Sequence, residues 1–401
     1  MNGNIDCVSA GHMNLDITPE FLTGGREVSE IFRPGKLIES GRAVMSSGGA
    51  VSNTGLALVK FGMDVRLMGR CGSDAFGKSL MDILRSNSPS AASSIHVVDD
   101  EQTSYSLVLA PPGIDRMIIH YPGANNNFSA ADVDYSVVAS AKLFHFGYPP
   151  LMAGMIANGG AELEKMFRDA RQTGVTTSLD TALPDPAGRA ANAPWTEIFT
   201  RVLPHVDIFT PSVEELMLML DRKSYDKLVD QACGGEILPL LESNQISALA
   251  DQCLAFGAAM VVIKCGYLGI YVKTAGADRI ENAGRAKPGN IDHWACREIF
   301  EPSYLVDKIA SATGAGDCAI AGFLTALIEG MDIDDALRCA CATGAQNLSA
   351  LNALDGVRSW QETIGQINSK GEKNPIDISM DGWTFDENAQ HYTGPADKKV
   401  P

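Results

Sequence analysis

The sequence predicts an α/β protein with a doubly wound, mostly parallel sheet, helices on both faces of that sheet, and a small β-sheet lid. Short apolar runs alternate with longer segments in which apolar residues recur at helical spacing. This alternation is typical of parallel strands joined by crossover helices. Two segments, 26–49 and 103–126, break the rhythm. Both alternate apolar and polar residues, as a small antiparallel sheet does when one face meets solvent.

Each element can be placed in order from its pattern. We expect strands at 5–11, 65–72, 141–147, 175–180, 206–212 and 259–266, and helices at 52–62, 78–87, 160–174, 214–220 and 246–258. A β-prone run at 304–310 leads into a glycine-rich turn and a helix, and the segment from 331 predicts a second helix. In the lid, a Pro-Pro-Gly turn at 111–113 is expected to join two strands. From 368 the chain is polar and without periodicity, which predicts an extended or mobile surface segment.

Composition excludes several classes of protein. At 401 residues, the chain can bury one large core with a smaller appendage. A formal net charge of −17 disfavours nucleic acid and anionic membrane as partners. The nine scattered cysteines favour a reducing compartment, and no signal-peptide pattern or membrane-length apolar run is seen. We therefore expect a cytoplasmic protein.

The turn from Ser311 to Asp317 carries the clearest chemistry. Gly314 and Gly316 let the backbone approach a ligand closely, and the following helix adds the partial positive charge of its N-terminus. Such a turn can hold a phosphate. Asp317 is a poor phosphate binder but a good acceptor of a proton from a hydroxyl. An anion cradle and a base on one turn suggest phosphoryl transfer to an alcohol.

Two nucleotide-binding patterns compete with this interpretation. Residues 314–319 satisfy the G-x-G-x-x-G/A dinucleotide fingerprint, but a helix rather than a strand is expected next. Residues 72–79 match the Walker A pattern. There Asp74 would place negative charge inside the phosphate cradle, and Phe76 would add bulk. We interpret residues 72–79 as a structural turn.

Five motifs in order resemble the ribokinase-like, or PfkB, carbohydrate kinases, over about 5–363. They are G-x-x-N-x-D at 11–16, Gly-Gly-x-x-x-Asn at 48–53, G-x-x-G-x-D-x-F-G at 69–77, a lid-to-core return at 120–125, and Thr-Gly-Ala-Gly-Asp at 313–317. The resemblance implies acceptor-site residues at Asn14, Asp16, Gly48, Gly49 and Asn53. It implies Asp317 as the base and an anion hole at Gly314, Ala315 and Gly316.

The resemblance also implies ATP and magnesium as cofactors. Glu215 would hold Mg²⁺ through water, with Ser212 standing where the family usually has Asn. The other nucleotide-binding positions implied are Lys264, Gly266, Gly269 and Thr313, with packing around the adenine supplied by 339–356. Ser311-Ala312 replaces a frequent Asp-Thr, which puts a monovalent-cation site in doubt. Ala50 replaces a frequent Lys, which removes one acceptor contact.

The function implied is transfer of the ATP γ-phosphoryl group to a hydroxyl of a small sugar. Alternatives are a nucleoside kinase of the same fold, with Phe32 and Tyr105 as candidates to stack a base, or a catalytically silent sugar- or nucleotide-binding protein. Taken alone, Asp16 and Asn53 could instead cap a turn or a helix. We expect a kinase domain at 1–367 with its lid at about 17–47 and 97–124, a polar extension at 368–401, and a homodimer formed through the lid.

Overall fold

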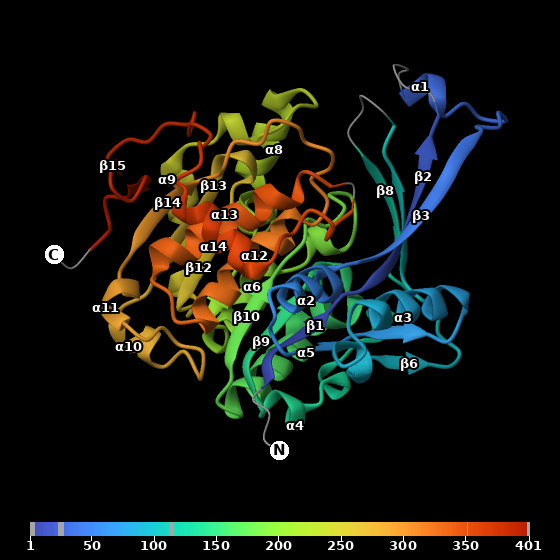
Figure 1. Ribbon diagram of the computed structural model, residues 1–401, viewed down its shortest axis with the longest axis horizontal. Helices are drawn as coiled ribbons and strands as arrows, with labels where there is room; N and C mark the ends of the chain where they lie inside the picture. The colour runs from blue at the N-terminus through green and yellow to red at the C-terminus, as the bar shows by residue number, and fades with distance from the viewer. Residues whose placement is uncertain (1–4, 23–27, 112–115, 351, 399–401) are drawn as a thin grey trace.

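The computed structural model describes residues 5–22, 28–111, 116–350 and 352–398. Its larger sheet has ten strands, in the order β15-β16-β14-β13-β12-β11-β10-β9-β1-β4 (Figure 1). Neighbours from β4 to β12 pair in parallel, and those from β12 to β15 pair antiparallel. The strands are β1 (Ile5–Gly11), β4 (Val65–Met68), β9 (Ala141–Gly147), β10 (Thr176–Asp180), β11 (Ile208–Phe209), β12 (Met260–Lys264), β13 (Gly269–Thr274), β14 (Glu298–Pro302), β15 (Thr384–Asp386) and β16 (His391–Thr393).

Apolar residues fill both faces of this sheet, which is why its central strands read as continuous apolar runs. Phe144 and Phe146 of β9 belong to one buried cluster, whereas Leu143 belongs to the other. The first cluster includes side chains of α5 (Ala153–Gln172), α6 (Trp195–Val202), α7 (Val213–Leu220), α8 (Arg222–Ala232) and α9 (Ser243–Ala255). The second includes side chains of α2 (Ala50–Lys60), α3 (Ala75–Asn87), α10 (Ala277–Glu281), α11 (Ile291–Trp294), α12 (Ala315–Ile328), α13 (Ile333–Asn347) and α14 (Trp360–Asn368). The predicted doubly wound α/β fold with helices on both faces is confirmed.

A four-stranded lid projects from the carboxyl end of the main sheet (Figure 1). Its order is β3-β2-β7-β8, from β2 (Asn14–Phe21), β3 (Ser40–Gly48), β7 (Tyr105–Leu109) and β8 (Met117–Tyr121), with the short helix α1 (Val28–Ile31) near its tip. The expected antiparallel sheet is wrong in one pairing, because β2 and β7 are parallel. Such strands are joined by a long crossover, here the main-body segment between them. The predicted turn at 111–113 lies largely outside the described residues.

Three predicted elements differ from the structure. The strand expected at 65–72 is divided into β4 and β5 (Arg70–Gly72), and β5 leaves the main sheet to pair with β6 (His96–Val98). The strand expected at 206–212 is reduced to β11. The helix expected at 160–174 is present as the second part of α5, after non-helical residues at 157–160. The run at 304–310 is no strand: β14 precedes it, and Tyr304 alone makes a β-bridge. Its apolar residues are partly exposed, with Leu305 49% and Ile309 62% accessible.

The tail does not simply lie on the surface, as its polar composition had suggested. β16 pairs with β14 and β15 pairs with β16, so the tail extends the main sheet by two strands. Trp383 contacts the rings of Tyr271 and Phe300. Trp383 thus gives the tail an apolar contact with the sheet, although the apolar residues of the tail are too sparse to give a periodic pattern. In the part of the chain that the structure describes, no helix combines the length and apolarity needed to cross a membrane.

Candidate active site

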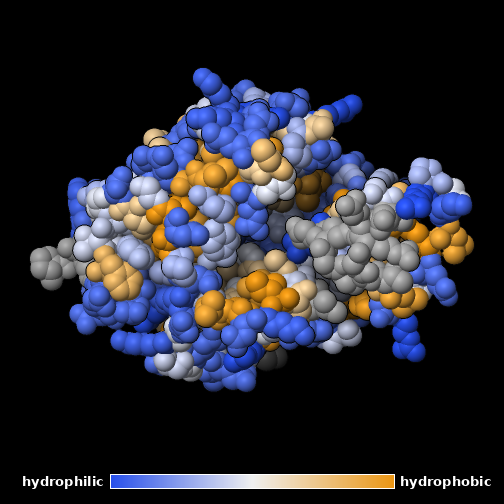
Figure 2. Space-filling view, turned by 90° about the horizontal axis from the view of Figure 1, so that it is seen from above, coloured by the Kyte–Doolittle hydropathy of each residue, from blue (hydrophilic) through white to orange (hydrophobic). Residues whose placement is uncertain are grey.

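The polar residues of the site follow the carboxyl ends of parallel strands. His12 follows β1, Tyr148 follows β9, Asp180 ends β10, Ser212 follows β11, and Lys264 ends β12. The carboxyl ends of parallel strands open onto one edge of a sheet, where α/β proteins bind ligands. Figure 2 shows the surface hollowed between the main body and the projecting lid.

The glycine-rich turn places Asp317 in the first turn of α12. Gly314 has a φ of 73°, and a Cβ there would lie 2.5 Å from the Cβ of Ala353, so both conformation and space require glycine. Asn347 Nδ2 donates to the Thr313 carbonyl at 2.7 Å and holds the turn from α13. The second helix predicted after this turn is α13, so the dinucleotide context is absent here.

The amides of this turn are unequal. The Ala315 N–H donates to the Ala312 carbonyl at 3.3 Å, whereas the Gly316 and Asp317 N–H groups find no acceptor among the described residues. A Cβ on Gly316 would lie 3.3 Å from Cδ of Lys264. Unpaired amides beside an ammonium group at a helix N-terminus can hold an anion.

The Asp317 carboxylate is buried and held by two side chains. Asn53 Nδ2 donates to Oδ2 at 2.9 Å, and the Tyr148 hydroxyl lies 2.8 Å from both oxygens. Burial raises the pKa of Asp317, although Lys264, Asn53 and Tyr148 act in the opposite direction. A raised pKa brings a carboxylate closer to the range in which a general base works at neutral pH.

Asn53 is the fourth residue of α2, whose N-cap is Gly49, so Asn53 is not the cap considered above. Its Oδ1 is buried and has no partner among the described residues, which leaves an acceptor for a ligand hydroxyl. Gly48 and Gly49 permit close packing around it. A Cβ on Gly48 would lie 2.3 Å from Asp16 Oδ2, and one on Gly49 2.6 Å from the His12 carbonyl.

Asp16 lies in the middle of β2, opposite Ser46 and Ser106, and therefore caps no turn. Asn14 Nδ2 donates to Asp16 Oδ1 at 2.5 Å and to Ser106 Oγ at 2.9 Å. Burial raises the pKa of Asp16 to about 6, and the charge of Asp317 adds to this effect, which places the two carboxylates in one site. Asn14 thus orients Asp16, as a supporting residue.

Two histidines continue this network. His120 Nδ1 lies 3.1 Å from Ser106 Oγ, and its Nε2 lies 3.2 Å from Nε2 of His12. Burial lowers the pKa of His12 well below 6.5, and His120 adds to the effect. Buried Asn125 holds the same segment by pairing with the backbone N–H and C=O of Met13, at 3.3 and 2.9 Å.

A second charged group lies beside Asp317. Lys264 Nζ is 2.5 Å from Asp180 Oδ1, while Asp180 Oδ2 is buried without a partner among the described residues. Burial lowers the pKa of Lys264, but the charges of Asp180, Glu215 and Asp317 outweigh it, and the net shift is upward. Three carboxylates thus stabilise one ammonium group, of which Asp180 contacts it directly.

Glu215 caps its own helix. Ser212 Oγ accepts from the Glu215 N–H at 3.3 Å, and Glu215 Oε2 accepts from the Ser212 N–H at 2.7 Å and from Thr181 Oγ1 at 2.6 Å. Among the described residues, no three His, Cys, Asp or Glu side chains converge to ligate a metal directly. The excess negative charge and the orphaned Asp180 oxygen nevertheless fit a hard divalent cation held largely through water.

The turn Gly266–Gly269 lies at the same sheet edge, after β12. Gly266 and Gly269 have φ values of 54° and 115°. A Cβ on Gly269 would lie 2.1 Å from the Glu301 carbonyl, so the turn packs directly on the end of β14. The parallel bridge between Ser212 and Lys264 places this turn next to the start of α7.

The Walker-like segment is a helix cap. Asp74 accepts from the Gly77 N–H at 2.8 Å and from Thr103 Oγ1 at 2.7 Å, and Lys78 is exposed. A Cβ on Gly77 would lie 1.9 Å from the Gly72 carbonyl. The structural turn expected at 72–79 is what the structure contains.

Sequence reasoning did not single out Tyr148, Asp180 or Ser106. It included His12, His120 and Asn125 in the motifs at 11–16 and 120–125 but gave them no role. Asp180 could have been found, because it is an acidic residue at the carboxyl end of a buried strand. Tyr148 carries no motif, and its left-handed backbone (φ 68°) is visible only in the structure.

Comparisons with known proteins show the family and the fold of this chain. The family described as pfkB family carbohydrate kinase matches residues 5–359. A 2-dehydro-3-deoxygluconokinase of Bacillus subtilis is 22% identical, covering 80% of this chain and 86% of that protein, and a ribokinase of Haemophilus influenzae is 23% identical, covering 83% and 90%. The solved structure of Arabidopsis thaliana ribokinase complexed with ribose and ATP superposes with a TM-score of 0.65 at 19% identity, covering 91% of this chain and 99% of that one.

Proposed function

The chain belongs to the PfkB family of carbohydrate kinases, and on that premise we propose that it transfers the γ-phosphoryl group of ATP to a hydroxyl of a small sugar. The observation that carries the proposal is the buried Asp317 carboxylate, which shares one turn with two unpaired amides. ATP-dependent phosphorylation of a sugar follows from the family. The acceptor class and the role of each residue are proposed from the site.

In the proposed step, the acceptor hydroxyl gives its proton to Asp317 while its oxygen bonds to the γ-phosphorus. The bond from that phosphorus to the bridging oxygen breaks, and ADP leaves. The Gly316 and Asp317 amides, with Lys264, face the charge that develops on the transferred group. Asn53 Oδ1 and Asp16 accept hydrogen bonds from other hydroxyls of the sugar.

Glu215 and Asp180 would hold Mg²⁺ beside the nucleotide. When bound, the ion supplies positive charge to the phosphate oxygens. Lys264 keeps Asp180 in place, and Ser212 and Thr181 orient Glu215. Thr313 and the Gly266–Gly269 turn would border the nucleotide on its other sides.

A sugar is favoured over a nucleoside by the arrangement of the lid. Asp16, Ser106 and His120 share one lid face, while Tyr105 lies on the other, against Phe76 and Tyr121. Phe32 is partly exposed and packs on Phe21. Neither aromatic candidate therefore supports stacking of a base over Asp16.

A homodimer through the lid is part of the proposal. Val44 and Met45 of β3, and Ile118 and Ile119 of β8, are each more than half exposed. Consecutive residues of a strand point to opposite faces, so each pair places one apolar side chain on either face of the lid. A second copy would cover the face that is turned away from Asp16.

The base is tested with Asp317→Asn. Turnover should fall about 10²–10⁴-fold, because the amide cannot take the proton, while ATP binding persists. Steady-state turnover and direct nucleotide binding would be measured on the same preparation. Near-normal turnover by the folded variant would exclude Asp317 as the base. If the wild-type chain binds ATP but phosphorylates no sugar or nucleoside, the protein is the catalytically silent binding protein considered above.

A further inference from the structure

The C-terminal strap, defined here as residues 369–398, lies beyond the segment that matches the family and reaches the edge of the proposed nucleotide site. Lys373 pairs with Tyr304 in an antiparallel bridge, and the Leu305 N–H donates to the Glu372 carbonyl at 2.9 Å. The strap therefore runs beside the end of β14, against which the Gly266–Gly269 turn packs.

A hydrogen-bond relay connects the strap to that turn. Asn374 Nδ2 donates to Ser303 Oγ at 2.8 Å, and Ser303 Oγ in turn donates to the carbonyl of Tyr267. A serine hydroxyl has one proton, so a donor that occupies its lone pair directs that proton to the remaining acceptor. Asn374 thereby aims the Ser303 proton at the turn.

Further contacts fix Asn374 and tie the strap to the turn. The Asn374 N–H donates to the Ser303 carbonyl at 2.8 Å, and its Nδ2 also donates to the Tyr304 carbonyl at 3.4 Å. On the turn itself, the Tyr267 hydroxyl donates to Asp377 at 3.3 Å. The strap thus holds both the backbone and the side chain of Tyr267.

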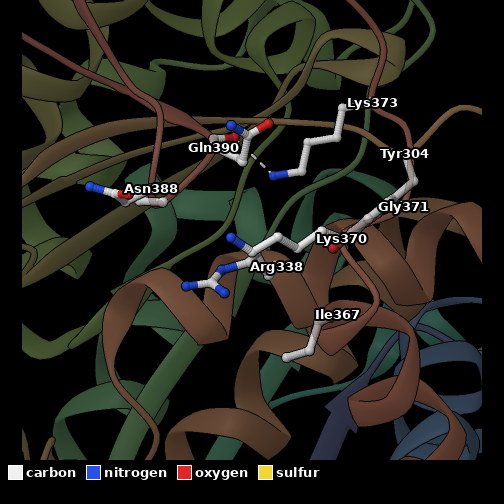
Figure 3. A pocket seen from close by; sticks show the side chains of 9 residues that line it. Tyr304, Arg338, Ile367, Lys370, Gly371, Lys373, Asn388 and Gln390 are labelled. Carbon is white, nitrogen blue, oxygen red and sulfur yellow. Dashed lines mark hydrogen bonds between the residues drawn. The ribbon is translucent and has the colours of Figure 1, made fainter.

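The strap is anchored on either side of this relay. Lys373 Nζ forms an ion pair with buried Glu301 and donates to the Gln390 carbonyl at 3.0 Å; Figure 3 shows its side chain extended toward Gln390. On the other side, Ile378 is buried in the main core, and the Ser243 N–H donates to the Ser379 carbonyl at 3.2 Å. An element held at both ends can fix the position of what it contacts between them.

We propose that Asn374 is a positioning residue for the nucleotide: through Ser303 and Tyr267, the strap sets the conformation of the Gly266–Gly269 turn. This inference rests on the proposed function, which puts the nucleotide beside that turn. The turn needs such support because both of its glycines have positive φ, and glycine leaves the backbone the most conformational freedom.

The test compares Asn374→Ala and Asn374→Asp with Asn388→Ala, an exposed strap asparagine away from the relay. Loss of one oriented hydrogen bond should raise the KM for ATP roughly 3- to 10-fold in both Asn374 variants. Asn374→Asp keeps the size of the side chain but can accept the Ser303 proton, which draws that proton from Tyr267. The kcat, the KM for the sugar and the melting temperature should stay near wild type, and Asn388→Ala should change nothing.

Amide hydrogen exchange of a peptide spanning 264–272 separates the possible failures. Faster exchange in the Asn374 variants together with a raised KM for ATP supports the proposal. Faster exchange with an unchanged KM for ATP overturns the positioning role, because it means that the nucleotide does not lie beside this turn. Unchanged exchange and KM, or a lowered melting temperature alone, overturns the coupling between strap and turn. If the wild-type chain phosphorylates no sugar at all, the proposed function itself is contradicted.

Discussion

Tyr148 is the residue through which the end of β9 acts on the proposed base. Its hydroxyl donates to both oxygens of Asp317, and a donor to a carboxylate lowers the pKa of that carboxylate. Its left-handed backbone (φ 68°) is strained for a residue with a side chain, at a cost of about 1 kcal/mol. We interpret this strain as the consequence of aiming the hydroxyl at Asp317.

Tyr148→Phe should therefore raise the pKa of Asp317. The acid limb of the pH–kcat profile is expected to move to higher pH by up to about one unit, since a hydrogen bond to a charged group is worth about 1.5 kcal/mol. Tyr135→Phe is the matched control, because the Tyr135 hydroxyl is buried without a partner among the described residues. An unshifted profile in Tyr148→Phe would mean that this hydroxyl does not support the base.

Asp16 predicts a pH dependence for the sugar. Its pKa of about 6, raised mainly by burial, means that it loses its charge as the pH falls through 6. Asp16→Asn should lower kcat/KM for the sugar about 10- to 100-fold at pH 8, because an amide is a weaker acceptor than a carboxylate. The gap between wild type and variant should narrow below pH 6. A difference in kcat/KM that does not change with pH would show that the charge of Asp16 takes no part in sugar binding.

The same shift has a consequence for stability. The pKa of Asp16 in the folded state lies above the ordinary value of 3.8, so the folded state binds the proton more tightly than the unfolded state does. The ionised carboxylate therefore lowers the free energy of unfolding at higher pH. Asp16→Asn should accordingly melt at a higher temperature than wild type above pH 6, and the difference should shrink as the pH falls and vanish below pH 3.8. If Asp16 were a cap, its replacement would instead lower the melting temperature.

At the scale of elements, the lid illustrates which predictions a pattern can support. Alternation along 40–48 and 117–121 indicated strands with one face toward solvent. β3 and β8 are strands, but exposed side chains lie on both of their faces. The parallel pairing of β2 with β7 depends on how the intervening main-body segment folds, which alternation cannot reveal. The strand predicted at 304–310 was wrong for a related reason. An apolar run forms a strand only where a neighbouring strand is available to pair with it.

The lid also carries the dimer prediction. Met45→Glu should convert a dimer into a monomer, since burying a charge in an apolar interface is costly. Light scattering coupled to size-exclusion chromatography would give the mass of each form. Val97→Glu is the control, because Val97 is similarly exposed (48%) but lies on β6, outside the lid. A wild-type chain that is monomeric at micromolar concentration would contradict the lid as an interface.

At the scale of the molecule, the tail is part of the folded unit. Asp397 lies 3.0 Å from Arg297, and both side chains are almost completely buried, at 4% and 3% exposed. Asp397→Ala would leave the Arg297 charge poorly compensated. The free energy of unfolding should fall by about 3–5 kcal/mol in denaturant titrations, with kcat near normal for the fraction that remains folded. Asp381→Ala, at an exposed position of the strap, is the control and should have little effect. If Asp397→Ala and Asp381→Ala have the same free energy of unfolding, the tail adds little to the stability of the fold.

The sequence by itself determined the α/β class, the two faces of the sheet, and the segment that bears Asp317. These follow from local properties: periodicity, the conformational freedom of glycine, and motifs that lie within a few residues. Tertiary structure alone decided that Asn53 and Tyr148, 264 and 169 residues away, bind one carboxylate, and that Lys264 faces Asp180. It also decided that a polar tail completes the sheet and reaches Tyr267. Such contacts depend on strand order and on the burial of charge, and neither property is encoded in any short stretch of the chain.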